Sequence, residues 1–387
     1  MKKYVVFISA LFALSCQQKK EMNRAEKMNM LGQKYVRLGL YIGLYDSDFI
    51  DAYYGPDSLK PVITKQAVFP KDSLIAAVNN LMTEVKSVIT ADQNDTLNAR
   101  ANWMTGQLTA FGRRIRIFSG ELAAFDEESK ELFGVAAPVY NEQHFQSLIA
   151  KFDSILPGKG DISTRFRQLG NRFIIPKDKI DTVFKTTIAE ARKRALAHYK
   201  LPANETFTLE YVTGKPWSGY NWYKGNYNSL IQINTDLPIS IERAIDLACH
   251  EGYPGHHVYN MLLEEKLYRQ KGWVEISLYP LFCPQSLIAE GSANFGIEVA
   301  FPGNDENVFI RTVLLPLAGL DTAGIDAYIA ALSLRKELNY ARNEAARGLL
   351  NGTMKEPEVM RWLTGYSLFS SDAALKSVSF IRNTAAM

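Results

Sequence analysis

The sequence predicts a mainly helical protein with a small β-sheet directly before a histidine-rich helix. Apolar residues recur at spacings of three and four through most of the chain, as on the buried face of an α-helix. The exception begins near residue 205, where apolar and polar residues alternate and β-branched and aromatic residues are frequent. With 387 residues, 47% of them hydrophobic, the chain has ample material for a large core.

The first residues have the pattern of a bacterial secretory signal. Residues 1–3 supply positive charge, Tyr4–Leu14 is an apolar run, and polar residues follow Cys16. The run is too short to cross a bilayer, so residues 1–15 are predicted to be a cleaved signal peptide. The cysteine resembles that of a lipobox, which implies a lipid on Cys16 and a tether over 16–23. The alternative is an ordinary signal peptide that contains a cysteine.

A single domain is predicted over 24–387, because no compositionally distinct linker divides it. Its first part, 24–204, is predicted to be helical, and its second part, 205–387, to hold the sheet and the histidine-rich site. Helical periodicity in the first part predicts helices over 24–45, 72–90, 96–120, 141–155 and 177–200.

Two strands are predicted, over Thr206–Thr213 and Ser229–Asn234, with glycine, proline and aromatic residues between them. After Glu298 the helical spacing returns. It predicts helices over 305–317, 321–351, 356–365 and 370–383.

Charge and cysteine content exclude some classes of function. Without residues 1–15 the chain has 42 basic and 41 acidic residues and no basic block, so a nucleic-acid partner is not expected. No other stretch reaches the eighteen apolar residues of a membrane-spanning helix. Cys249 and Cys283 remain once Cys16 is assigned to a lipid, and they are either paired in an oxidising compartment or two free buried thiols.

The stretch His250–His257, HEGYPGHH, holds three of the five histidines of the chain, with Glu251 directly after the first. Neutral imidazole is the commonest protein ligand for zinc, and a neighbouring carboxylate can serve as a general base. These residues predict a site for one zinc ion, with His250 as a ligand and Glu251 as the catalytic base.

The second histidine ligand depends on how the helix passes Pro254. Proline gives no amide proton to the carbonyl of His250 and clashes with it, so the helix is expected to open or bulge at Pro254-Gly255. A two-residue bulge would place His256 where the residue four positions after His250 lies in a regular helix. On an unbroken helix His257 would lie near the same face, but some 10 Å further along the axis. His256 is therefore the predicted ligand and His257 the alternative.

A catalytic zinc site needs a third protein ligand and an open position for water. The segment Ser286–Gly296 is predicted to be a helix with small residues on one side, which lets it approach a neighbour closely. Its carboxylate, Glu290, is the predicted third ligand, and Glu298 is the fallback. Asp246, one turn before His250, is a candidate to orient an imidazole, or else an exposed helix carboxylate.

HEGYPGHH, followed some thirty residues later by Ala289–Gly296 (AEGSANFG), resembles the DUF885 family of bacterial proteins, which is similar to the gluzincin metallopeptidases. Further stretches that resemble a branch of this family are Asp51–Pro56, Leu156–Gly158 and Lys215–Tyr223. The resemblance therefore covers nearly all of the mature chain, and HExxPGHH is its most specific part.

The resemblance implies a helical, zincin-type metallopeptidase scaffold with zinc held by His250, His256 and Glu290 and with Glu251 as base. It also places an extended peptide along an edge strand, with possible cleft-wall residues Trp217, Tyr220, Trp222 and Tyr223. The chain departs from the family at Ser292, where tryptophan is expected. Relatives are also expected to continue beyond Met387 with a helix that bears tyrosine and arginine.

The predicted function is zinc-dependent hydrolysis of peptides or peptide-like amides by a lipoprotein of the bacterial envelope, periplasmic or attached to the outer membrane. Tyr340 and Arg342 are candidates to stabilise the developing oxyanion. One alternative is hydrolysis of a non-peptide amide or ester. Another is a lipid-anchored zinc- or peptide-binding protein without turnover, against which the retained base Glu251 argues.

Overall fold

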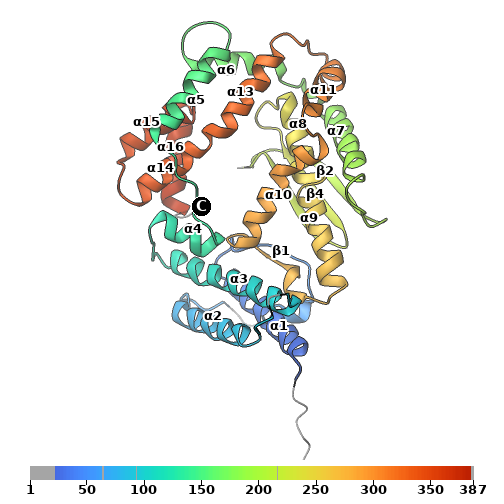
Figure 1. The fold of residues 1–387 in the computed structure, drawn as a ribbon, viewed down its shortest axis with the longest axis vertical. Coiled ribbons are helices and arrows are strands. Elements are labelled where there is room, and N and C mark those ends of the chain that lie inside the picture. Colours follow the sequence, from blue (N-terminus) through green and yellow to red (C-terminus); the bar gives the residue numbers. More distant parts are fainter. Residues whose placement is uncertain (1–21, 63–64, 93, 216, 385–387) are drawn as a thin grey trace, which may run out of the picture.

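The computed structural model describes residues 22–62, 65–92, 94–215 and 217–384, which form a mainly helical fold with two small sheets (Figure 1). The predicted fold class is confirmed at this level. The predicted signal peptide and Cys16 lie outside the described residues, as does most of the tether. None of the helices in the described part of the chain has the length and apolar character needed to cross a membrane.

Three N-terminal helices share one core, α1 (Arg24–Gly43), α2 (Lys71–Lys86) and α3 (Thr96–Phe118). Helix α1 begins with a capping box in which the side chains of Asn23 and Glu26 each accept a hydrogen bond from the other's backbone amide. These helices therefore agree with the predicted periodicity and differ from it only in their ends.

A short strand ties this N-terminal part to the rest of the molecule. Strand β1 (Ile50–Tyr53) pairs antiparallel with β5 (Leu278–Pro280), more than two hundred residues later. Neither strand was predicted, because three or four residues are too few to show an alternation. The pairing brings the segment around Asp51 next to the beginning of α10 (Pro284–Ala300).

The second sheet has the strand order β2-β4-β3. Strand β2 (Thr206–Val212) is parallel to β4 (Asn228–Asn234), which is antiparallel to β3 (Gly219–Gly225). Both predicted strands are confirmed, as β2 and β4. Strand β3 was missed because its glycine and aromatic residues resemble a loop. Every second residue of β4 is buried, with Ile231 and Ile233 in the main core.

The main core lies between this sheet and the helices that surround it. The helices of the central region are α4 (Phe125–Phe133), α5 (Glu142–Ile155), α6 (Ile162–Gly170), α7 (Ile180–Ala195) and α8 (Ile241–Leu247). Helices α4 and α6, of nine residues each, were not predicted.

The C-terminal helices are α11 (Asp305–Phe309), α12 (Leu315–Ala318), α13 (Ile325–Leu338), α14 (Tyr340–Leu350), α15 (Glu356–Tyr366) and α16 (Ser371–Thr384). The single helix predicted over 321–351 is wrong at Asn339. The backbone amide of Asn339 donates to the carbonyl of Lys336, three residues earlier, instead of to the carbonyl four residues earlier as in an α-helix. Helices α14, α15 and α16 enclose a small core of their own, on the opposite side of Figure 1 from α7 and α8.

Candidate metal centre

The helix that carries His250 opens where the proline predicts it. Helix α8 continues into a π-helical turn, η4 (Ala248–Gly252), in which the amide of Tyr253 donates to the carbonyl of Ala248, 3.0 Å away. The backbone then leaves the helix through a cis Tyr253-Pro254 bond, and α9 (His256–Leu263) begins at His256. The predicted interruption at Pro254-Gly255 is confirmed, as a π-turn followed by a break.

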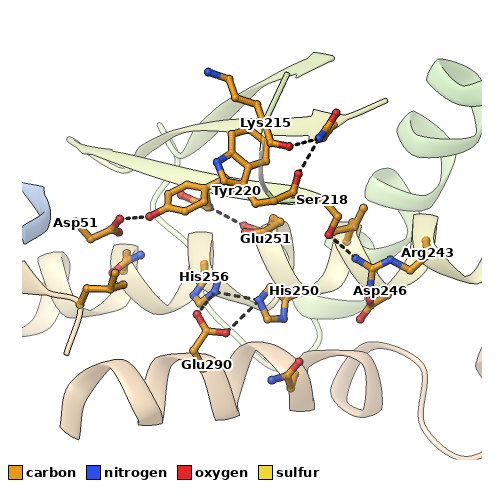
Figure 2. A pocket seen from close by; sticks show the side chains of 18 of the residues that line it. Asp51, Lys215, Ser218, Tyr220, Arg243, Asp246, His250, Glu251, His256 and Glu290 are labelled. Atoms are coloured by element: carbon orange, nitrogen blue, oxygen red, sulfur yellow. Dashed lines mark hydrogen bonds and ion pairs between the residues drawn. The ribbon is translucent and has the colours of Figure 1, made fainter. Parts of the chain in front are cut away.

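Three potential metal ligands meet at this break: His250, His256 and Glu290 (Figure 2). The two Nε2 atoms lie 3.1 Å apart. The carboxylate of Glu290, on α10, lies 3.5 Å from Nε2 of His250 and 3.4 Å from Nε2 of His256. Four ligands at about 2.0–2.1 Å from a zinc ion are separated by roughly 3.3 Å at tetrahedral angles. The three side chains are therefore close enough together to hold a metal ion, and their spacing is compatible with zinc.

The charges of these three groups are coupled. Burial would raise the pKa of Glu290, but hydrogen bonds with His250 and His256 hold it well below its ordinary value. Burial would lower the pKa of His250, yet the carboxylate of Glu290 raises it. The carboxylate is thus kept ionised, which is the form that binds a cation.

His257 points away from this group and is fully buried. Its Nδ1 lies 2.9 Å from the hydroxyl of Ser229 on β4, and its Nε2 lies 3.1 Å from the carboxylate of Glu205. Glu205 also accepts hydrogen bonds from Tyr253, at 2.6 Å, and from Arg192. Of the two alternatives for the second histidine, the structure therefore places His256 beside His250 and Glu290, and gives His257 a place in a buried network beneath α9.

Glu251 is 5% exposed and borders the same cavity as the two histidines. Burial raises the pKa of its carboxyl group, although the nearby His250 and His256 lower it in part. The backbone carbonyl of Glu251 accepts a hydrogen bond of 2.6 Å from the side chain of Asn221 on β3. Strand β3 therefore fixes the turn that holds the predicted base.

Asp51 and Tyr220 complete the site. Asp51 was assigned no role from sequence, and Tyr220 was predicted only as a possible wall residue of the cleft. The hydroxyl of Tyr220, on β3, donates a hydrogen bond to Asp51, on β1 (Figure 2). Burial raises the pKa of both groups, and the charges of His256 and Glu290 also act on Asp51. The sequence offered one signal for Asp51, which is the first residue of a stretch that resembles the family. Its position at the site could not be inferred, because it depends on the pairing of β1 with β5, more than two hundred residues apart.

A cavity of about 710 Å³ lies over the three potential ligands and is bordered by β3, η4, α9 and α10. Of the four predicted wall residues, Trp217 and Tyr220 line it. Trp222 instead donates to Gln232, and Tyr223 is buried and donates to Glu264. Their side chains belong to the sheet and its packing.

Two other predicted carboxylates do not join the three potential ligands. Asp246 borders the cavity but pairs with Arg243, so the expectation that it orients an imidazole is not met. Glu298, the fallback ligand, does not belong to the group of His250, His256 and Glu290. Its negative charge contributes to the raised pKa of Glu306.

The predicted oxyanion donors are also placed away from the cavity. Tyr340 packs against Tyr140, with ring centroids 5.0 Å apart, and the guanidinium of Arg342 lies over Phe369. Both residues are on α14, whose neighbours include α13, α15 and α16. Neither residue lines the cavity, so the structure does not bring these two candidates to the site.

Cys249 and Cys283 are both free and buried. Burial raises the pKa of each thiol, that of Cys283 to about 12. Of the two alternatives for these cysteines, the structure has the pair of free thiols.

Small residues on α10 allow its close approach to the π-turn. An atom added as Cβ on Gly296 would stand 3.4 Å from both the carbonyl of Cys249 and the ring of Pro254. This packing is what brings Glu290, almost two turns earlier on α10, to the histidines. Ser292, where relatives are expected to have tryptophan, donates only to the carbonyl of Ala289.

Comparison of the chain with models of protein families, with curated proteins and with solved structures gave no match in any of the three.

Proposed function

We propose that this protein is a zinc-dependent hydrolase of peptides or peptide-like amides, related to the DUF885 family and anchored in the bacterial envelope through a lipid on Cys16. The observation that carries the proposal is the group of His250, His256 and Glu290. Their ligand atoms have the mutual distances of a tetrahedral zinc site, and Glu251 borders the same cavity.

His250, His256 and Glu290 would hold the zinc ion beside the cavity. Zinc bound there lowers the pKa of a water molecule and polarises a carbonyl group. Glu251 is the base that accepts the proton of the attacking water and then gives it to the leaving amine. Its burial supports this role, because a carboxylate removed from bulk water holds a proton more readily.

Tyr220 is the proposed donor to the developing oxyanion. Its hydroxyl remains protonated because burial and the nearby Asp51 raise its pKa. In the structure this hydroxyl donates its one proton to Asp51, and the bond fixes the ring over the site (Figure 2). To stabilise the oxyanion, the O–H group would turn from Asp51 toward the substrate. Tyr220 thus replaces Tyr340 and Arg342 in the role first expected of them.

The cavity also suits an extended peptide. Strand β3 is at the edge of its sheet and contributes Gly219, Tyr220 and Asn221 to the cavity wall. Edge strands pair with extended peptides through their free backbone groups. The side-chain oxygen of Asn221 is buried and has no partner among the described residues, so it can accept a hydrogen bond from a substrate amide.

The test combines metal analysis with hydrolysis by the mature protein. About one zinc per chain is expected in the wild type, together with cleavage of a mixed peptide pool that a chelator abolishes and added zinc restores. Glu251→Gln is expected to keep the zinc and to lower the rate by roughly 10²–10⁴-fold. Full zinc without cleavage of any peptide would refute the peptidase proposal, and cleavage of esters alone would move it to a non-peptide hydrolase.

A further inference from the structure

A second cavity, of about 560 Å³, is lined by residues of α3, the end of α9 and the beginning of α10. It shares no lining residue with the cavity over the proposed zinc ligands. Its volume is within the range of about 300–1,000 Å³ that is usual for small-molecule sites. Its walls are mainly apolar and include Trp103, Leu263, Leu267, Trp273, Ile276 and Ile288.

Unpartnered amide groups lie in this apolar wall. Both polar atoms of the Gln107 carboxamide are buried without a hydrogen-bond partner among the described residues, and the same holds for the side-chain oxygen of Gln285. Gln107 is fully buried and Gln285 is 5% exposed. Buried polar groups in native proteins nearly always have partners, so such a cluster indicates a missing one.

The cavity carries no free charge. Arg100 is the one charged side chain among its described lining residues, and it forms two hydrogen bonds with the carboxylate of Glu275, of 2.5 and 2.8 Å. Both side chains are buried, and the guanidinium also lies 5.0 Å from the ring centroid of Trp273. A charged ligand would lose its hydration here without gaining a counter-ion.

We propose that this second cavity binds an uncharged, mainly apolar molecule that carries a carboxamide. The two polar atoms of Gln107 offer one donor and one acceptor, and an amide presents the complementary acceptor and donor. The oxygen of Gln285 accepts a second amide hydrogen. The apolar remainder of the ligand lies against Trp103, Trp273 and Ile288.

Three probes of equal length separate this proposal from general apolar binding: octanamide, 2-nonanone and octanoate. The ketone accepts but does not donate hydrogen bonds, and the carboxylate is charged. Calorimetric titration of the zinc-loaded protein is expected to show one octanamide per chain. Its affinity should be roughly ten- to a hundredfold higher than that of 2-nonanone, because the amide donates two buried hydrogen bonds that the ketone cannot, and octanoate should bind weakest.

Two variants assign the binding to this cavity. Gly106→Leu fills it, because a Cβ at Gly106 meets only the ring of Pro284, at an ordinary 3.7 Å. Octanamide binding should be lost while the zinc content and the cooperative thermal transition remain. Gln107→Leu removes both unpartnered atoms of that side chain and should reduce the preference for the amide over the ketone to what the oxygen of Gln285 provides.

Two results would overturn the proposal. Equal affinity for octanamide and 2-nonanone in the wild type would show an unspecific apolar cavity. Absence of octanamide binding, with Gln107→Leu more stable than the wild type, would show that Gln107 is only a packing defect. Because the readouts are amide affinity and stability, neither result bears on the zinc-dependent hydrolase proposal.

Discussion

A Cβ atom on Gly255 would lie 1.9 Å from the carbonyl oxygen of His250. This carbonyl has lost its usual helical partner at Pro254, and the chain folds back so closely over it that only glycine fits. The contact links the two histidines of the proposed zinc site, since Gly255 directly precedes His256. The backbone conformation of HEGYPGHH therefore requires glycine at position 255.

Gly255→Ala is expected to destabilise the protein by about 3 kcal/mol, the upper end of overpacking costs, and to abolish zinc binding. The added methyl group would meet backbone atoms, which cannot move aside as a side chain can. Urea unfolding and zinc analysis measure the two effects. Gly291→Ala is the matched control, because nothing lies within 4 Å of its Cβ position on α10. It should keep zinc and gain up to about 1 kcal/mol of stability.

The adjacent histidines should separate metal binding from stability. His256→Gln is expected to lose zinc and to remain folded, because this side chain borders the cavity. His257→Gln is expected to keep zinc but to lose roughly 1–3 kcal/mol of stability, because Glu205 and Ser229 lose a buried partner. Zinc analysis alongside urea unfolding tests both variants, and loss of zinc only in His257→Gln would contradict the assignment of His256.

Tyr220→Phe should test the proposed oxyanion donor. If peptides are cleaved, kcat is expected to fall by roughly 10²–10³-fold with zinc content unchanged, as on removal of other oxyanion donors. Asp51→Asn, which keeps a hydrogen-bond acceptor for the hydroxyl, should lower kcat less. An unchanged kcat in Tyr220→Phe would assign the Asp51–Tyr220 pair to packing alone.

The buried ion pair between Arg100 and Glu275 joins α3 to the segment before β5. Glu275→Gln is expected to cost about 3–5 kcal/mol, because it leaves the guanidinium buried without its counter-charge. Thermal or urea unfolding measures this loss. The control is Glu84→Gln, which removes an exposed pair with Lys34 and should cost about 1 kcal/mol or less. Equal losses in the two variants would contradict the expectation.

The network beneath α9 predicts how stability changes in acid. Burial alone would raise the pKa of Glu205, but hydrogen bonds from His257, Tyr253 and Arg192 lower it from 4.5 to about 2. The ionised carboxylate therefore contributes its full stability above pH 4.5, and this contribution is lost as the pH falls toward 2. Glu205→Gln should be less stable than the wild type at neutral pH, and the difference should shrink between pH 4.5 and 2. A difference that does not change over this range would contradict the pKa shift.

Local sequence determined most of the helices and the break in the histidine-rich segment. Apolar spacing predicts α1, α2, α3 and α5 because each buries one face along a single run of residues. Pro254 and Gly255 predict the interruption because their effects act on the nearest backbone groups. The candidacy of His250 and Glu251 likewise follows from residues that are adjacent in sequence.

Tertiary structure alone decided which distant residues join them. Pairing of β1 with β5 carries Asp51 to the site, edge strand β3 places Tyr220, and the packing of α10 against η4 brings Glu290 to the histidines. The packing of α14 against α13, α15 and α16 keeps Tyr340 and Arg342 away from the cavity. The positions of Asp51, Tyr220 and Glu290 depend on contacts between segments more than thirty residues apart. Such contacts produce no periodic pattern in a single sequence. Local rules therefore specify which residues can do the chemistry, and only packing between distant segments specifies which of them meet.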